Sequence, residues 1–207
     1  MKLIVFGATG GIGAHVVEQA LAAGHEVTAV ARRPSAITLK HERLNVVQGD
    51  VLDEASIRRA IVGKDVVVSA VGARDRNPTT VYSAGVANMM QAMQAAHVSR
   101  IFCISASGLD PAPLWQRLIA KPLLWFFLKN MYTDLVRMEN EVSSTRLDWT
   151  ILRPPQLTDG PRTGHYQSAV NKRLARILKI SRADVADYIV THLDDKTTYR
   201  GLVELAY

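Results

Sequence analysis

The stretch Gly7-Ala8-Thr9-Gly10-Gly11-Ile12-Gly13 follows the apolar run Leu3-Ile4-Val5-Phe6 near the start of the chain. A buried strand thus precedes the glycines, and a helical pattern follows them, which is the context of a dinucleotide-binding turn. Glycine at 7 permits a tight turn, and glycine at 10 lets the backbone approach a diphosphate. Glycine at 13 lets helix and strand pack closely. The stretch therefore predicts a phosphate-binding turn rather than an ordinary connection.

Outward from this turn, strands and helices alternate, which predicts a parallel sheet covered by helices on both faces. Further strands are expected at 27–31, 45–48, 66–70, 100–105, 149–152 and 202–205. Helices are expected from the glycines to Gly24, from Asp53 to Ile61, from Thr80 to Ala96 and after a cap at Ser181. Residues 166–180 fit two short strands better than one basic helix. The predicted fold class is α/β, a single-domain Rossmann-type, doubly wound and mostly parallel sheet over residues 1–207.

Composition excludes several classes of protein. The chain has 207 residues, 48% of them hydrophobic, and a net charge of only +6, which excludes a disordered chain. A single cysteine, Cys103, excludes a disulfide framework and a cysteine-based zinc site. Cys103 lies in an apolar run, so we expect a buried and inert thiol. The six histidines show no metal-ligand spacing, and no metal site is expected.

Charge and hydropathy argue against a membrane span and against nucleic acid as a partner. No stretch reaches the roughly 18 apolar residues that a membrane span requires, and the apolar run at the start is too short for a signal peptide. We therefore expect a soluble, cytoplasmic protein. The pI is about 9.6, yet the basic residues are scattered except for one run. That run is Lys172, Arg173, Arg176, Lys179 and Arg182. It lacks interleaved aromatic residues, which favours a solvated face over a phosphate-backbone track.

The residues after the second and third strands bear on the choice of cofactor. Arg32 and Arg33 stand where an NAD-dependent enzyme usually has an acidic residue for the ribose 2′-hydroxyl. Two guanidinium groups there would attract the 2′-phosphate of NADPH, although two surface arginines are the alternative. Asp50, after the third strand, can accept from an adenine amino group or belong to an ordinary turn. We therefore predict NADP(H) as the cofactor.

No tyrosine has a lysine four residues later, where the commonest short-chain dehydrogenases place the lysine that lowers the tyrosine pKa. Those positions hold Val86, Val136, Val170, His192 and Val203, and Tyr207 ends the sequence. A Tyr-Lys proton relay is therefore absent, and alcohol oxidation by that route is not expected.

An ordered set of short motifs covers nearly the whole chain. The set is Phe6-Gly7-Ala8-Thr9-Gly10, Gln48-Gly49-Asp50-Val51, Gly72-Ala73-Arg74, Pro78-Thr79-Thr80-Val81, Ala92-Met93, Ser105-Ala106, Arg137-Met138, Arg153-Pro154-Pro155, Thr163-Gly164-His165-Tyr166 and Ile180-Ser181-Arg182-Ala183-Asp184. Together with the Gly-x-x-Gly-x-x-Gly spacing and the missing relay, it resembles an atypical short-chain dehydrogenase/reductase. Within that superfamily it is similar to the flavin reductase / biliverdin-IXβ reductase group, near the NmrA-like NAD(P)-binding proteins.

The resemblance implies NADPH-dependent hydride transfer to a flavin-, quinone- or tetrapyrrole-like acceptor, with a non-catalytic NADP(H)-binding regulatory protein as the alternative. It implies phosphate contacts from Gly7, Thr9, Gly10, Gly11, Ile12 and Gly13, and a 2′-phosphate contact from Arg32, with Arg33 beside it. Asp50 and Val51 would hold the adenine, Ala70, Gly72 and Arg74 the middle of the cofactor, and Ser105 and Pro154 the nicotinamide end. Ser105 would also orient the substrate, unless it is only a turn hydroxyl.

Two departures from the group concern the acceptor. Gln156 stands where the group's reductases carry a histidine, and a neutral amide cannot deliver a proton near pH 7. A longer apolar segment, which includes Trp115, lies between Ser105 and Arg137. It is interpreted as a lid over an apolar pocket, as core or a dimer patch, or as a membrane-surface contact. We expect a substrate-side region at about 106–135 and 154–182, with Trp115, Tyr132 and Gln156 facing the acceptor. The acceptor's identity and the oligomeric state stay open.

Overall fold

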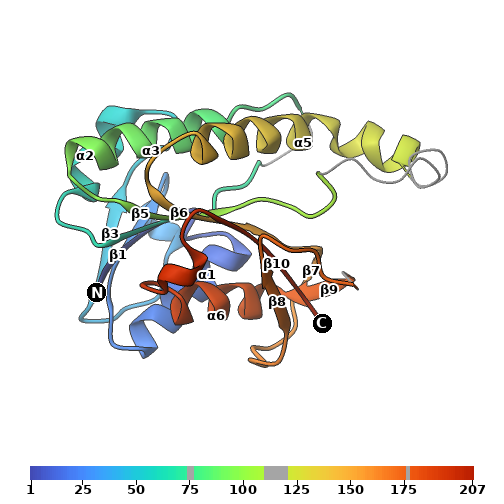
Figure 1. Ribbon diagram of the computed structural model, residues 1–207. Helices are drawn as coiled ribbons and strands as arrows, with labels where there is room; N and C mark the ends of the chain where they lie inside the picture. Colours follow the sequence, from blue (N-terminus) through green and yellow to red (C-terminus); the bar gives the residue numbers. More distant parts are fainter. Residues whose placement is uncertain (74–76, 110–120, 176–177) are drawn as a thin grey trace.

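The computed structural model describes residues 1–73, 77–109, 121–175 and 178–207 (Figure 1). Within these ranges, eight strands form one sheet in the order β3-β2-β1-β4-β5-β6-β10-β8. They are β1 (Lys2–Phe6), β2 (Glu26–Ala31), β3 (Leu44–Gln48), β4 (Val66–Ser69), β5 (Arg100–Ile104), β6 (Asp148–Arg153), β8 (Gln167–Val170) and β10 (Gly201–Ala206). Neighbouring strands are parallel, except that β8 runs antiparallel to β10. The predicted fold class is confirmed.

Helices cover both faces of the sheet, as Figure 1 shows. On one face lie α1 (Gly11–Ala22) and α6 (Arg182–Thr191), and on the other α2 (Glu54–Ile61), α3 (Ser83–Ala95) and α5 (Lys121–Ser143). Side chains of β1 alternate between the two cores: Leu3 and Val5 pack toward α1 and α6, and Ile4 and Phe6 pack toward α2 and α3. All four are fully buried, which explains why this strand is a continuous apolar run.

Two short strands lie beside the main sheet and pair with each other. They are β7 (Gln156–Thr158) and β9 (Lys179–Ser181), and their pairing is parallel. Because β8 and β9 both fall within or next to residues 166–180, the prediction of two strands there is confirmed and the single basic helix is wrong. The short 3-10 turns η1 (Pro34–Ala36) and η2 (Lys196–Thr198) complete the described elements.

The start of α3 differs from the prediction, since the helix begins at Ser83 rather than at Thr80. Its N-terminus is capped from another helix. The buried Asp134 carboxylate on α5 accepts the backbone N–H of Tyr82 at 2.9 Å and the hydroxyl of Ser83. Such a cap supplies the partner that free N–H groups at a helix start need. It cannot be seen in the local sequence, because Asp134 lies about fifty residues away.

Other local predictions have mixed outcomes. Ser181 caps α6 as expected, since its hydroxyl accepts the N–H of Asp184 at 3.0 Å. Asp53 precedes α2, but its side chain makes no capping bond. Cys103 is fully buried, and burial raises the pKa of its thiol to about 12, so the expected inert thiol is confirmed.

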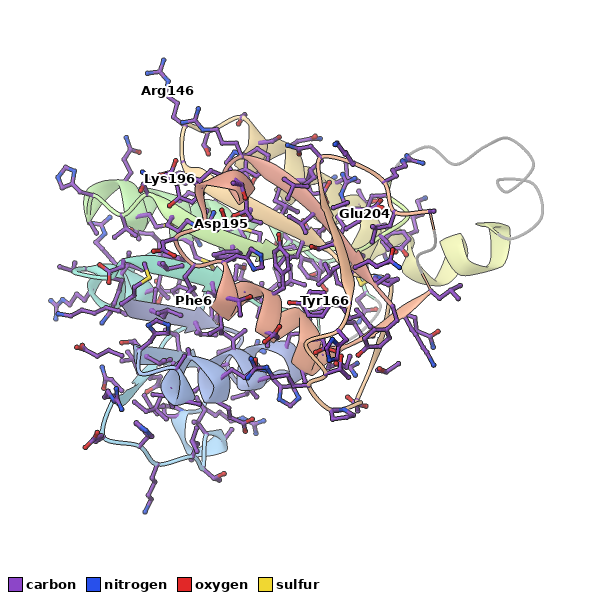
Figure 2. All side chains as sticks on the ribbon, turned by 60° about the horizontal axis from the view of Figure 1, so that its bottom comes forward. Phe6, Arg146, Tyr166, Asp195, Lys196 and Glu204 are labelled. Carbon is purple, nitrogen blue, oxygen red and sulfur yellow. The ribbon has the colours of Figure 1, made fainter. Side chains whose placement is uncertain are left out.

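Figure 2 shows the exposed Arg146 extending away from the ribbon, whereas the fully buried Phe6 lies inside the molecule. Among the described residues, no helix combines the length and the apolar character needed to cross a membrane.

Candidate functional site

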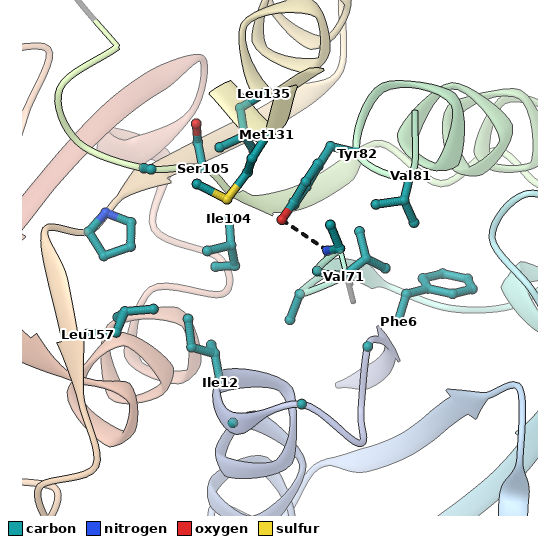
Figure 3. Close-up of a pocket in the computed structure, with 18 of the residues that line it drawn as sticks. Phe6, Ile12, Val71, Val81, Tyr82, Ile104, Ser105, Met131, Leu135 and Leu157 are labelled. Atoms are coloured by element: carbon teal, nitrogen blue, oxygen red, sulfur yellow. Dashed lines mark hydrogen bonds between the residues drawn. The ribbon is translucent and has the colours of Figure 1, made fainter. Parts of the chain in front are cut away.

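A cavity of about 1810 Å³ lies along the carboxyl ends of the central strands (Figure 3). Residues at or after the ends of β1, β2, β3, β4, β5 and β6 line it. The sheet order places β1 beside β4, so the chain leaves these neighbours in opposite directions, and ligands of such folds bind in the crevice at that point. Pockets for a single small ligand measure roughly 300–1,000 Å³, so this cavity has room for two ligands side by side.

The glycine turn forms one wall of this cavity. Gly7 has a φ of 77°, which other residues adopt only with strain. A Cβ on Gly13 would overlap the carbonyl of Gly7, so helix and strand approach as closely as the sequence predicts. The residue at the cap position of α1 is Gly10, which has no side chain to cap the helix, and the first turn holds no acidic residue. The free N–H groups and the helix dipole make this wall suited to an anion such as a diphosphate.

The wall after β2 and β3 carries charge. Arg32 lines the cavity and is exposed, whereas the exposed Arg33 does not line it. Asp50 and Val51 also line it. One Asp50 carboxylate oxygen accepts the N–H of Leu52 at 3.0 Å. Of the two roles that the sequence left open for Asp50, this bond is the one expected in an ordinary turn. Asp50 thus stabilises its own turn at the edge of the cavity.

Beyond β4 and β5 the cavity is lined by Ala70, Gly72 and Ser105, with Pro154 from the end of β6. A Cβ on Gly72 would meet nothing within 4 Å, so there is open space above the backbone. Ser105 is 7% exposed, and its buried hydroxyl oxygen has no hydrogen-bond partner among the described residues. A buried polar group in a native protein is normally paired, so this hydroxyl points to a ligand. The residues present therefore fit a bound dinucleotide.

The far wall of the cavity is apolar. Figure 3 shows Met131 and Leu135 reaching in from α5 on one side, and Leu157 from β7 near Ile12 of α1 on the other. Leu178 lies on the same wall and is 64% exposed. Tyr132 and Gln156 also line the cavity. This end can hold a flat, apolar molecule.

Two tyrosines line the cavity, but neither is activated as an acid. Burial raises the pKa of Tyr82 and of Tyr132 above the usual value. The Tyr82 hydroxyl accepts the backbone N–H of Ala73 at 3.1 Å (Figure 3). Among the residues that the structure describes, no lysine and no histidine lines the cavity. Within these residues, no lysine is therefore placed to lower the pKa of Tyr82 or Tyr132.

A family model described as NAD(P)H-binding matches residues 7–196. The chain belongs to this NAD(P)H-binding family. The match begins at the glycine turn, directly after β1, and covers β2, β3, β4, β5, β6 and α6.

This NAD(P)H-binding protein is also similar to individual proteins over nearly its whole length. YwnB of Bacillus subtilis, an uncharacterized protein, is 26% identical over 200 residues, which are 94% of this chain and 92% of YwnB. Among solved structures, the anaerobillin reductase ChuY from Escherichia coli O157:H7 has 25% identity and a TM-score of 0.78, covering 100% of this chain and 97% of ChuY. A wide-type short-chain dehydrogenase/reductase from Veillonella parvula, in complex with NADP, has 19% identity and a TM-score of 0.78, covering 100% and 94% of the two chains. At that identity the last likeness concerns the fold alone.

Most residues that the sequence singled out come together in the cavity of the NAD(P)H-binding fold. Those that line it are Gly7, Thr9, Gly10, Gly11, Ile12, Arg32, Asp50, Val51, Ala70, Gly72, Ser105, Tyr132, Pro154 and Gln156. Gly13 lies beneath the turn, and Arg33 lies outside the lining. Arg74 and Trp115 lie outside the described residues.

Sequence reasoning missed several lining residues. They include Tyr82, Met131, Leu135, Arg137, Leu157, Leu178 and Arg182. Met131 and Leu135 are four residues apart on a helix, a spacing that places both on one face, but the sequence does not say which face meets the cavity. Arg182 belongs to the basic run that was interpreted as a solvated face, so the sequence did not predict its place in the cavity.

Proposed function

We propose that this chain is an NADPH-dependent reductase that delivers hydride directly to a conjugated, flat acceptor of the flavin, quinone or tetrapyrrole kind. The observation that carries the proposal is the composition of the cavity's far end. In the part of the chain that the structure describes, it has apolar walls, a serine hydroxyl without a partner, and no tyrosine with a lowered pKa. Orientation of two ligands, rather than proton delivery by a side chain, is the chemistry that such an end supports.

The residues take separate parts in this mechanism. The glycine turn and the start of α1 hold the diphosphate, Arg32 holds the 2′-phosphate, and Ser105 orients the nicotinamide end. When bound, NADPH supplies the hydride that reduces the acceptor, and the accompanying proton comes from water. Met131, Leu135 and Leu157 exclude water from one side of the acceptor and hold it flat.

The likeness to an anaerobillin reductase supports a tetrapyrrole-like acceptor among the candidates, and the absence of a Tyr-Lys relay supports acceptors that need no protein acid. The test is the loss of reduced-nicotinamide absorbance with NADPH, and with NADH alongside, against flavins, quinones, linear tetrapyrroles and dichlorophenolindophenol. Turnover with any of these acceptors supports the proposal. Tight NADPH binding without turnover of any acceptor would overturn it in favour of an NADP(H)-binding regulatory protein, a role that Gln156 in place of histidine would suit.

Arg32→Ala is expected to weaken NADPH binding by about 10- to 100-fold, the value of charge-assisted hydrogen bonds to a phosphate. NADH binding should stay unchanged, because NADH lacks the 2′-phosphate. Arg33→Ala is the matched control: Arg33 is the adjacent arginine but does not line the cavity, so we expect a small effect. Titration with each coenzyme, followed by nicotinamide fluorescence, gives the ratio of the NADH and NADPH dissociation constants for each variant. An equal loss for NADH and NADPH would contradict a 2′-phosphate contact.

Ser105→Ala is expected to separate stability from activity. Removal of a buried hydroxyl that has no partner in the protein should leave the free energy of unfolding unchanged or raise it by about 1 kcal/mol. Turnover should fall by roughly five- to tenfold, the value of about one hydrogen bond to the bound ligands. Urea unfolding and steady-state rates test the two effects, with Ser144→Ala, outside the cavity lining, as the control. A stability loss with normal turnover would show that Ser105 is only structural.

A further inference from the structure

Arg182 is the first residue of α6, yet its side chain lies across the start of α1. The space that a Cβ on Gly11 would occupy is filled by the Arg182 side chain, with its Nε 2.9 Å from that position. Gly11 is the first residue of α1, and both residues line the cavity. The fold therefore brings a guanidinium group from near the C-terminus onto the phosphate-binding turn.

The ion pair that this guanidinium makes within the protein is weak. Its Nη1 pairs with the Asp159 carboxylate at 2.5 Å, and Asp159 is 91% exposed in its side chain. Within the described part of the chain, Asp159 is its only partner. An ion pair at the surface contributes about 0–1 kcal/mol, because water screens it. The pair can therefore open or be shared when a stronger anion arrives.

Electrostatics at the turn favour such an anion. The N-terminus of a helix carries a partial positive charge, which is stabilised by acidic groups and not by basic ones. Here α1 has a glycine at its cap position and no acidic residue in its first turn, and the nearby Arg182 side chain is cationic. Two positive groups face one space, so an anion between them would interact favourably with both. The Ser105 hydroxyl in the same cavity has no partner within residues 1–73, 77–109, 121–175 and 178–207, which independently indicates a missing ligand.

We infer that Arg182, whose side chain packs on Gly11, binds the diphosphate of the dinucleotide together with the glycine turn, and that Asp159 holds the guanidinium before the dinucleotide binds. The inference rests on the proposed cofactor site and deepens it. Because the diphosphate is common to NADH and NADPH, Arg182 contributes affinity for both coenzymes, whereas Arg32 contributes affinity for NADPH alone.

The test uses Arg182→Met, which keeps a long stem to pack on Gly11 and removes the charge and the donors. The dissociation constants of NADPH, NADH and ADP, measured by calorimetry on the full chain, should all rise by about tenfold. Arg182→Lys, which keeps the charge and loses the planar fork, should recover part of that loss. Thermal unfolding of each free variant shows whether it folds, so an affinity loss is compared only between folded proteins.

Three outcomes would overturn the inference. Unchanged affinities in Arg182→Met would mean that Arg182 only packs on Gly11. A loss confined to NADPH would place Arg182 on the 2′-phosphate instead of the diphosphate. A loss of the same size in Asp159→Asn would show that Asp159 is needed for binding and is not merely a resting partner; we expect unchanged or tighter binding there. Failure of the proposed function alone is distinguishable, since the unaltered chain would then bind coenzyme without reducing any acceptor. A chain that binds no coenzyme would overturn both.

Discussion

Gly7→Ala is expected to weaken NADPH binding by at least about a hundredfold and to lower the free energy of unfolding by about 3 kcal/mol. The backbone of Gly7 has a φ of 77°, where a Cβ costs about 1–2 kcal/mol. The added Cβ would also overlap the backbone carbonyl of Ala70 at the end of β4. Because that atom belongs to backbone, relief requires β1 and β4 to separate at the wall where the diphosphate would lie.

A second glycine separates the cost of the backbone conformation from the cost of the overlap with Ala70. Gly63, in the turn after α2, has a φ of 69°, and a Cβ there would meet nothing within 4 Å. Gly63→Ala therefore measures the cost of the backbone conformation alone, about 1–2 kcal/mol, with normal coenzyme binding. Urea unfolding and coenzyme titration are measured on both variants. If Gly7→Ala costs no more stability than Gly63→Ala and still binds NADPH normally, the close approach at Ala70 has no role in the site.

The fold could be predicted because its signals are local and repeated. Leu3 to Phe6 form a continuous apolar run since both faces of β1 are covered, and the glycines follow directly because the chain must turn there. The start of α3 could not be predicted, because Asp134 from α5 supplies its cap. The helix propensity of the residues around Ser83 cannot reveal a capping residue that only the tertiary fold brings close.

The residues of the candidate site likewise fall into those that local sequence predicts and those that only the tertiary fold brings together. Residues that follow a strand, such as Arg32, Asp50 and Ser105, could be found from the sequence, since every parallel strand delivers its carboxyl end to one edge. Arg182 could not, because it reaches Gly11 from α6, about 170 residues later in the chain. One signal was available: an arginine at the first position of a helix opposes the helix dipole, which suggests that something other than helix stability selects it.

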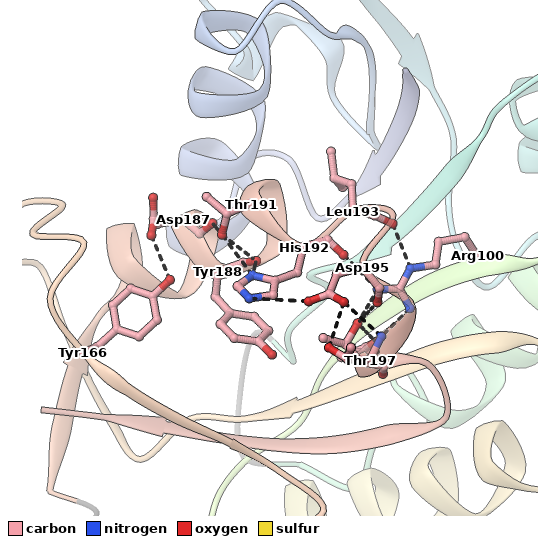
Figure 4. Close-up of polar contacts among 11 residues, drawn as sticks. Arg100, Tyr166, Asp187, Tyr188, Thr191, His192, Leu193, Asp195 and Thr197 are labelled. Carbon is pink, nitrogen blue, oxygen red and sulfur yellow. Dashed lines mark hydrogen bonds and ion pairs between the residues drawn. The ribbon is translucent and has the colours of Figure 1, made fainter.

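Arg100→Met is expected to lower the free energy of unfolding by about 4 kcal/mol, because it leaves several buried acceptors without donors. Arg100 is 4% exposed on β5, and its guanidinium donates to the carbonyls of Leu193, Asp148 and His192 at 2.9, 2.9 and 3.1 Å. It also donates to the hydroxyls of Thr150 and Thr198 at 2.7 and 3.0 Å. Figure 4 shows how these bonds tie β5 to the segment after α6.

Aromatic rings complete the environment of this cation. The guanidinium carbon lies 4.0 Å from the ring centroid of Phe102 and 4.5 Å from that of Tyr199, both favourable cation–π distances. Burial lowers the pKa of Arg100 to about 10, which still leaves the group charged at neutral pH. Methionine could fill part of the volume between the rings, but it offers no donor to the carbonyls.

Two controls and one further readout make the Arg100 prediction specific. Arg100→Lys keeps the charge but offers only three donors, so we expect roughly half the loss. Arg146→Met changes an exposed arginine and should stay within about 0.5 kcal/mol of the unaltered chain. Below its unfolding temperature, Arg100→Met should bind NADPH normally, because Arg100 does not line the cavity. Reduced affinity in the folded variant would instead mean that the bonds of Arg100 to the segment after α6 also hold Arg182 over the glycine turn.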